Sequence, residues 1–122
     1  MTILVIEDDS AIREMLVQTL ADEGFAVVSA ADGMEALSYL QTAAELPCVI
    51  LLDLMMPRMN GWQFREIQRN HPAISSIPVV VLSARPDLRA RQAEIGVEAY
   101  LTKPVNFDLL MQIIRRYCDD AG

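Results

Sequence analysis

Five short apolar segments, each followed by a longer segment with helical spacing of its apolar residues, constrain the fold of this chain most strongly. Within each short segment the apolar residues are continuous, which is typical of strands that are buried on both faces of a sheet. Their alternation with helices predicts an α/β protein, a doubly wound (βα)5 three-layer sandwich with a five-stranded parallel sheet and right-handed crossovers. The predicted strands cover residues 2–6, 25–30, 48–53, 77–83 and 98–102.

Capping residues mark where the predicted helices begin. Asp32 is followed three residues later by Glu35, which is the spacing of a capping box. Asn60 and Gln63 repeat this spacing, and Asn106 is placed to cap the last helix. The predicted helices cover residues 10–24, 32–45, 60–70, 85–96 and 106–118.

Length and charge limit the classes of protein to which the chain can belong. Its 122 residues suffice for one core, so residues 1–122 are expected to form a single domain. The net charge of −7 argues against direct binding to nucleic acid or to an anionic membrane surface, because both need basic residues. The apolar N-terminal run is too short for a signal peptide or a membrane span, so a cytoplasmic location is expected.

The two cysteines, Cys48 and Cys118, are far apart in the sequence and lie in apolar or helical surroundings. They have neither the spacing of metal ligands nor that of a CxxC motif. We therefore expect two reduced thiols that pack in the interior, and not a disulfide.

Chemically reactive side chains follow four of the five predicted strands. The carboxyl ends of parallel strands meet at one edge of the sheet, where open α/β sheets bind their ligands. The acid that ends the run VILLD can face this crevice instead of the core. The residues at this edge are Glu7, Asp8 and Asp9 after the first strand, Asp53 at the end of the third, Ser83 at the end of the fourth, and Lys103 and Pro104 after the fifth.

Asp8, Asp9 and Asp53 are predicted to bind a divalent cation. Three carboxylates in one pocket repel one another, and a cation relieves this repulsion. Hard oxygen ligands suit Mg²⁺ in particular. The alternative for Asp8 and Asp9 is a solvated acidic turn that caps the first helix.

A bound cation and the Lys103 ammonium would together attract a dianionic phosphoryl group. Asp53 would then be the nucleophile, because carboxylates can form acyl phosphates. The Ser83 hydroxyl could donate a hydrogen bond to a phosphoryl oxygen, although a loop serine often only caps a turn. Pro57 and Gly61 would shape the loop after the third strand so that backbone groups approach the site.

The motifs EDD, DLMMPRMNG, LSA and YLTKP, in this order and spacing, together resemble the receiver domain of two-component response regulators. The resemblance covers essentially the whole chain and implies the flavodoxin-like strand order 2-1-3-4-5. It implies that Asp53 is the phosphoacceptor. It also implies that Mg²⁺ (or Mn²⁺) is bound by Asp8, Asp9, Asp53 and the backbone carbonyl of Met55.

The resemblance further implies which residues contact the phosphoryl group. Lys103 would pair with it, and the backbone N–H of Ala84 would donate to it. Ser83 would be the switch hydroxyl, and the rotamer of Tyr100 would follow its movement. Without the resemblance, Tyr100 would be read as a packing residue. Pro104 would follow a cis Lys103–Pro104 bond.

The implied partners are a sensor histidine kinase or a histidine phosphotransfer protein as phosphodonor, and an effector as target. The effector would dock on the face formed by the fourth helix, the fifth strand and the fifth helix. The chain would be a signalling phosphoacceptor that assists its own phosphorylation and dephosphorylation, not an enzyme in the ordinary sense. It would be a monomer or a weak, phosphorylation-dependent homodimer, and either a stand-alone receiver or one domain of a longer regulator.

Three other functions have to be weighed against this one. A flavin-binding electron carrier of similar fold needs a phosphate loop after the first strand, but the acidic EDDS segment would repel a phosphate. A phosphatase with an aspartyl nucleophile usually has a second acid two residues later, where this chain has Met55. The main alternative is a degenerate receiver that binds its partners without being phosphorylated.

Overall fold

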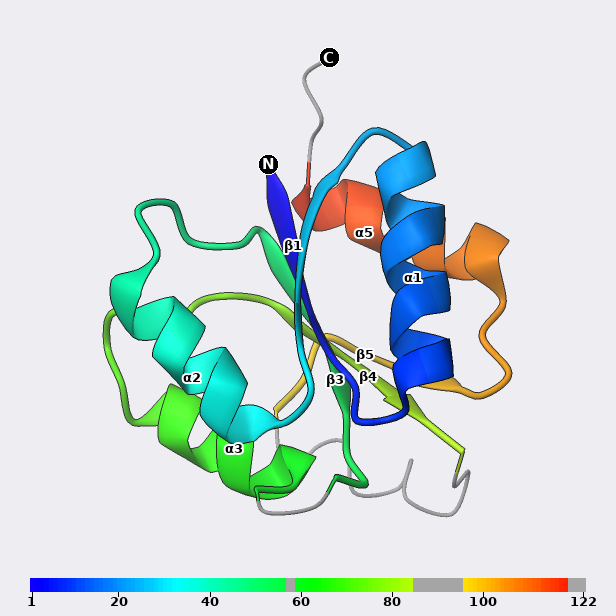
Figure 1. Cartoon of the computed structure of the whole chain (residues 1–122). Helices are drawn as coiled ribbons and strands as arrows, with labels where there is room; N and C mark the ends of the chain where they lie inside the picture. Colours follow the sequence, from blue (N-terminus) through cyan, green and yellow to red (C-terminus); the bar gives the residue numbers. More distant parts are fainter. Residues whose placement is uncertain (57–58, 85–95, 119–122) are drawn as a thin grey trace.

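The computed structural model describes residues 1–56, 59–84 and 96–118 (Figure 1). Helices and strands alternate as predicted up to residue 83, and a further strand and a further helix follow after residue 98. The elements are, in chain order, β1 (Thr2–Ile6), α1 (Ser10–Asp22), β2 (Ala26–Ala30), α2 (Gly33–Thr42), β3 (Val49–Asp53), α3 (Gly61–Arg69), β4 (Val79–Ser83), β5 (Ala99–Thr102) and α5 (Phe107–Tyr117). The helix predicted over residues 85–96 falls, except for its last residue, outside the described residues.

The strands form one parallel sheet in the order β2-β1-β3-β4-β5, which confirms the predicted topology. β3 and β4 are buried along their whole length, and β1 is buried after its first residue. The register pairs Ile6 with Leu52, Asp53 with Leu82, and Ser83 with Thr102. The carboxyl ends of β1, β3, β4 and β5 therefore meet at one edge of the sheet.

Two apolar cores lie on opposite faces of the sheet, because consecutive strand residues point to opposite sides. Leu4 and Ile6 pack with Phe64 in the core beneath α2 and α3. Ile3 and Val5 contribute to the core beneath α1 and α5. Figure 1 shows these two helix pairs on either side of the sheet, which completes the three layers.

The predicted caps are present at the starts of the helices. Asn60 and Gln63 form a complete capping box at α3, and the side chain of Asn106 accepts a hydrogen bond at the start of α5. α2 ends at Thr42 and not at residue 45 as predicted: the backbone of Ala43 is already extended, with φ −68° and ψ 129°, and residues 43–48 form the connection to β3. Within the described ranges, no helix is both long and apolar enough to cross a membrane.

Cys48 and Cys118 are joined by a disulfide, so the prediction of two separate reduced thiols was wrong. Cys48 directly precedes β3, and Cys118 is the C-cap of α5. α5 runs back along the sheet, so that its last turn lies at the end of the molecule where the chain begins (Figure 1). This return brings the two Cα atoms to 5.4 Å although 70 residues separate them in sequence.

Candidate functional site

Three carboxylates gather at the carboxyl edge of the sheet. Oxygen atoms of Glu7, Asp8 and Asp53 lie within 4.8 Å of one another. Glu7 is 2% exposed and Asp53 is 5% exposed, whereas Asp8 faces solvent. Acids from the ends of β1 and β3 therefore share one pocket that opens to solvent on one side.

Asp9 lies outside this cluster, contrary to its predicted place among the metal ligands. Its Oδ1 accepts a hydrogen bond of 3.1 Å from the backbone N–H of Ile12, and Asp9 is the N-cap of α1. The capping alternative weighed for Asp8 and Asp9 thus describes Asp9, while Asp8 belongs to the cluster.

Glu7 takes the place in the cluster that the sequence analysis gave to Asp9. Its backbone N–H donates to the carbonyl of Ala30 at 3.0 Å and so continues the hydrogen bonding of β1 with β2. The sequence contained a signal for this outcome. Asp9 stands directly before the helix that begins at Ser10, and Asp is a preferred capping residue, so this position favours a side chain that binds the helix and not a metal ion.

Lys103 is the cation that reaches into the cluster from the end of β5. Its Nζ lies 2.6 Å from Glu7 Oε1 and 3.7 Å from Asp53 Oδ1, and its side chain is 15% exposed. The backbone N–H of Lys103 donates to the carbonyl of Ser83 at 2.8 Å, which fixes the lysine to the end of β4. The Lys103–Pro104 bond is cis, as predicted.

The pKa of Asp53 shows how its surroundings act on this carboxyl group. Burial is the largest effect and raises the pKa, and the hydrogen bond and negative charge of Glu7 raise it further. Lys103 and the backbone N–H of Met55, 3.2 Å from Asp53 Oδ1, lower it. The net result is a pKa of about 8 instead of 3.8. The pocket thus holds more negative charge than Lys103 neutralises, and its oxygen donors fit a small divalent cation.

Arg13 also belongs to this site, although the sequence analysis did not single it out. Its Nη1 donates to the backbone carbonyl of Glu7 at 2.8 Å and to that of Asp8 at 3.3 Å. The guanidinium therefore holds the backbone of the loop that carries two of the three acids. The position of Arg13 in the first turns of α1 gave no signal, since exposed arginines are common there.

Ser83, Ala84 and Tyr100 lie close to the carboxyl edge. Ser83 is the last residue of β4, is fully buried, and comes one residue after Leu82, the partner of Asp53 in the sheet. Ala84 follows it and is exposed. Tyr100 is 3% exposed and packs in the core beneath α2 and α3, a position that suits the packing alternative.

The loop after β3 is described except for residues 57–58, so the predicted role of Pro57 lies outside the described residues. Met55 is 49% exposed, and the binding of a metal by its carbonyl oxygen stays a prediction. Gly61 begins α3 and donates its N–H to the carbonyl of Leu54 at 3.0 Å. A Cβ atom at Gly61 would lie 2.7 Å from Leu54 Cα, so the missing side chain lets α3 begin directly against the end of β3.

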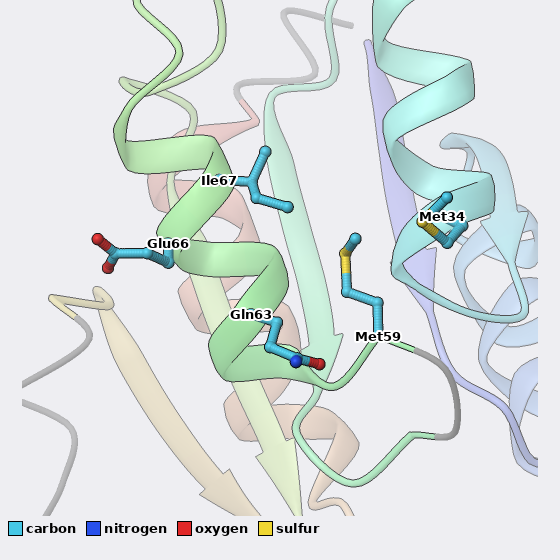
Figure 2. Close-up of a pocket in the computed structure, with 5 residues that line it drawn as sticks. All are labelled: Met34, Met59, Gln63, Glu66 and Ile67. Atoms are coloured by element: carbon cyan, nitrogen blue, oxygen red, sulfur yellow. The ribbon is translucent and has the colours of Figure 1, made fainter.

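A further hollow of the described surface lies elsewhere, between α2 and α3. It has a volume of about 610 Å³ and is lined by Met34, Met59, Gln63, Glu66 and Ile67. Figure 2 shows the side chain of Met59 between Ile67 on α3 and Met34 on α2. Glu66 is the one ionisable residue among these five, whereas the acidic pocket combines three carboxylates with a lysine. The acidic pocket is therefore the better candidate for the functional site.

The model of the response regulator receiver domain family matches residues 3–115 of the chain. The chain belongs to this family. Receiver domains are signalling phosphoacceptors and not conventional enzymes, and they interact with histidine kinases. Family membership therefore agrees with a pocket that contains an acid at the end of β3 and a lysine after β5.

Individual relatives of this receiver domain agree with the assignment. The regulatory protein SphR of Synechococcus elongatus is 40% identical over 111 residues, which cover 84% of this chain but only 42% of SphR. PilG of Pseudomonas aeruginosa is 34% identical over 94% of this chain and 85% of PilG. The structure of the chemotaxis protein CheY4 of Vibrio cholerae matches with a TM-score of 0.84 at 32% identity, over 95% of this chain and 97% of CheY4. The receiver thus resembles both longer regulators and proteins of its own size.

Proposed function

We propose that Asp53 accepts a phosphoryl group from a phosphohistidine of a sensor histidine kinase or a histidine phosphotransfer protein. The observation that carries this proposal is the meeting of Asp53 with Glu7, Asp8 and Lys103 in one pocket. A buried acid beside two further acids would be unfavourable for stability alone, whereas a phosphoryl-transfer site needs this concentration of charge.

Glu7, Asp8 and Asp53 would hold a Mg²⁺ or Mn²⁺ ion, with the Met55 carbonyl as a further oxygen ligand. The ion, when bound, supplies positive charge that favours the ionised form of Asp53 and attracts phosphoryl oxygens. Asp9 is not part of this proposed ligand set, because its side chain caps α1.

Phosphoryl transfer would proceed by attack of an Asp53 carboxylate oxygen on phosphorus. The P–N bond to the donor imidazole breaks as the new P–O bond forms, and the imidazole leaves with the electron pair. Lys103 would move its ammonium toward a phosphoryl oxygen, since it already lies 3.7 Å from Asp53 Oδ1. The Ser83 hydroxyl and the Ala84 backbone N–H would donate to the other oxygens.

The new aspartyl phosphate adds a charge of roughly −1.5 to −2 and strong acceptor oxygens at the ends of β3 and β4. Ser83 and Lys103 are joined by a backbone hydrogen bond, so a movement of Ser83 toward the phosphate would displace the start of the segment that leads to α5. The side chain of Tyr100 on β5 would change its rotamer when Ser83 moves. We propose that an effector docks on the face that includes β5 and α5, and that the receiver is monomeric or dimerises weakly when phosphorylated.

The test is intact mass after incubation with Mg²⁺ and acetyl phosphate, for the wild type and four variants. Wild type should gain one phosphoryl group, and Asp53→Asn should gain none. Asp8→Asn should need a higher Mg²⁺ concentration because it loses a ligand. Asp9→Asn is the matched control and should behave as wild type, since asparagine caps a helix equally well. Lys103→Ala should be phosphorylated more slowly.

Two results would contradict the proposal. A folded wild type that gains no phosphoryl group from acetyl phosphate or phosphoramidate would favour the degenerate receiver that binds partners without phosphorylation. A requirement for Asp9 as strong as that for Asp8 would contradict the ligand set proposed from the structure.

A further inference from the structure

The disulfide between Cys48 and Cys118 lies at the edge of the sheet where the strands begin, opposite to the acidic pocket. It connects the residue before β3 with the residue that ends α5. β3 and α5 pack against each other, since residues of both belong to the core beneath α1 and α5. A bond at this position determines whether the last turn of α5 is tied to the sheet.

A backbone hydrogen bond anchors each cysteine, Cys48 to the start of β1 and Cys118 to the last turn of α5. The N–H of Cys48 donates to the carbonyl of Thr2 at 2.9 Å, and the N–H of Cys118 donates to the carbonyl of Ile114 at 2.8 Å. Their Cα atoms lie 5.4 Å apart. Disulfides have Cα distances of about 4.4–6.8 Å, so the bond fits the positions that β3 and α5 give to the two residues.

The reduced form would be accommodated by the same surroundings. Cys48 Sγ lies 3.2 Å from the carbonyl oxygen of Thr2, which can accept the hydrogen of a free thiol. Cys118 is fully buried among apolar side chains, where a thiol behaves as a small apolar group. The surroundings of the two sulfur atoms are therefore compatible with the dithiol as well as with the disulfide.

We propose that Cys48 and Cys118 are a reversible redox site that a low-molecular-weight disulfide, such as glutathione disulfide, converts between dithiol and disulfide. Cys48 is partly exposed and Cys118 is fully buried, so Cys48 is the residue that exchanges with the external disulfide. The oxidised form ties the last turn of α5 to the start of β3. This proposal does not depend on phosphorylation of Asp53, so each can fail without the other.

Oxidation takes place in two exchanges. The Cys48 thiolate attacks one sulfur of glutathione disulfide, and one glutathione thiolate leaves. The Cys118 thiolate then attacks Cys48 Sγ in the mixed disulfide, and the second glutathione leaves. Two electrons pass from the protein to the external disulfide, and the two thiol protons end on the two released glutathiones.

The experiment follows the reduced 122-residue chain during incubation with glutathione disulfide, with acid quenching, thiol alkylation and intact mass. Wild type should lose two hydrogens, resist alkylation and carry no glutathione. Cys118→Ala should stop at a mixed disulfide with one glutathione on Cys48. Cys48→Ala should stay unmodified while folded, and should take up glutathione once urea exposes Cys118. Alanine is used because it adds no polar group to the core.

Thermal unfolding supplies an independent measurement. Oxidised wild type should melt on the order of 10 °C above reduced wild type, because the bond closes a long loop in the unfolded chain. The Cys48→Ala variant should melt at one temperature with or without reductant.

The proposal is overturned if folded wild type accumulates the mixed disulfide with glutathione without closing its own bond, or if both of its thiols stay reduced and open to alkylation. It is also overturned if the two single variants react at equal rates, since the order of exchange would then not follow from burial.

Discussion

Replacing Gly61 with alanine should destabilise the domain, because the new methyl group has no room. Gly61 is the first residue of α3. Its Cβ would lie 2.7 Å from Leu54 Cα, 2.7 Å from Leu54 Cδ2 and 2.9 Å from the carbonyl oxygen of Asp53. Two of these three atoms belong to the backbone at the end of β3, so relief requires that α3 and the strand move apart.

The magnitude follows from two opposing effects. Forcing a methyl group into a packed interior costs roughly 1–3 kcal/mol. Alanine restricts the unfolded chain more than glycine does and recovers about 0.4–1 kcal/mol. We expect a net loss of about 1–2 kcal/mol in the free energy of unfolding, measured by urea denaturation with an unchanged slope.

Gly33→Ala is the matched control. Gly33 is the first residue of α2 and follows an Asp cap, as Gly61 follows an Asn cap. A Cβ at Gly33 would lie 2.7 Å from Met59 Sδ and 2.9 Å from Met59 Cγ, atoms of a flexible side chain beside the groove of Figure 2. Met59 can turn aside, so this variant should stay within about 0.5 kcal/mol of wild type. Equal losses for the two variants would refute the argument that backbone contact decides the cost.

Two further predictions concern buried polar groups. In metal-free buffer the pKa of Asp53 is raised from 3.8 to about 8. Between about pH 4 and pH 8 the unfolded chain therefore releases this proton while the folded chain keeps it, so the free energy of unfolding of the wild type should fall as the pH rises through this range. Asp53→Asn lacks this titration, so its advantage over wild type in urea denaturation with EDTA should grow from pH 5 to pH 8; a constant difference would contradict the raised pKa. Gln68 is fully buried, donates to the carbonyls of Ile74 and Ile77 at 2.9 and 3.1 Å, and accepts from Arg65 Nη1 at 2.8 Å. Gln68→Leu should therefore cost about 2–4 kcal/mol, because it removes the side-chain donor of the two carbonyls and the acceptor of the guanidinium. The exposed Gln18, bonded to Asp22, is the control, and Gln18→Leu should cost less than about 0.5 kcal/mol; a similarly small loss at Gln68 would argue against a role for its hydrogen bonds.

Sequence reasoning identified the strands well because burial on both faces leaves a continuous apolar run, and β3 and β4 show this burial. It also brought Asp53 and Lys103 together, since carboxyl ends of parallel strands meet by topology. The predicted set of metal ligands after the first strand was partly wrong, because Glu7 and not Asp9 joins Asp8 in the cluster. The position of Asp9 directly before the helix that begins at Ser10 was the signal that separates it from the other two acids, and it was not used.

Contacts that depend on the path of the chain in space were beyond sequence reasoning. The pairing of Cys48 with Cys118 needs α5 to return to the start of β3, and no local pattern records this return. The same holds for Arg65, whose Nη1 donates to Gln68 at 2.8 Å and whose Nη2 donates to the Gly96 carbonyl at 2.8 Å. Burial lowers the pKa of Arg65, although the residue reads as an ordinary helical surface arginine in the sequence.

The contact between Lys103 and Glu7 spans 96 residues of a 122-residue chain. It therefore exists only after the first and the last strand have both joined the sheet, with β3 and β4 already between them. Such long-range closure is entropically costly and comes late in folding. A nascent or incompletely folded chain has the aspartate but not the pocket. Phosphorylation at this site would consequently require that the whole domain has folded. Incompletely folded copies would not be phosphorylated, and no additional mechanism would be needed to exclude them from signalling.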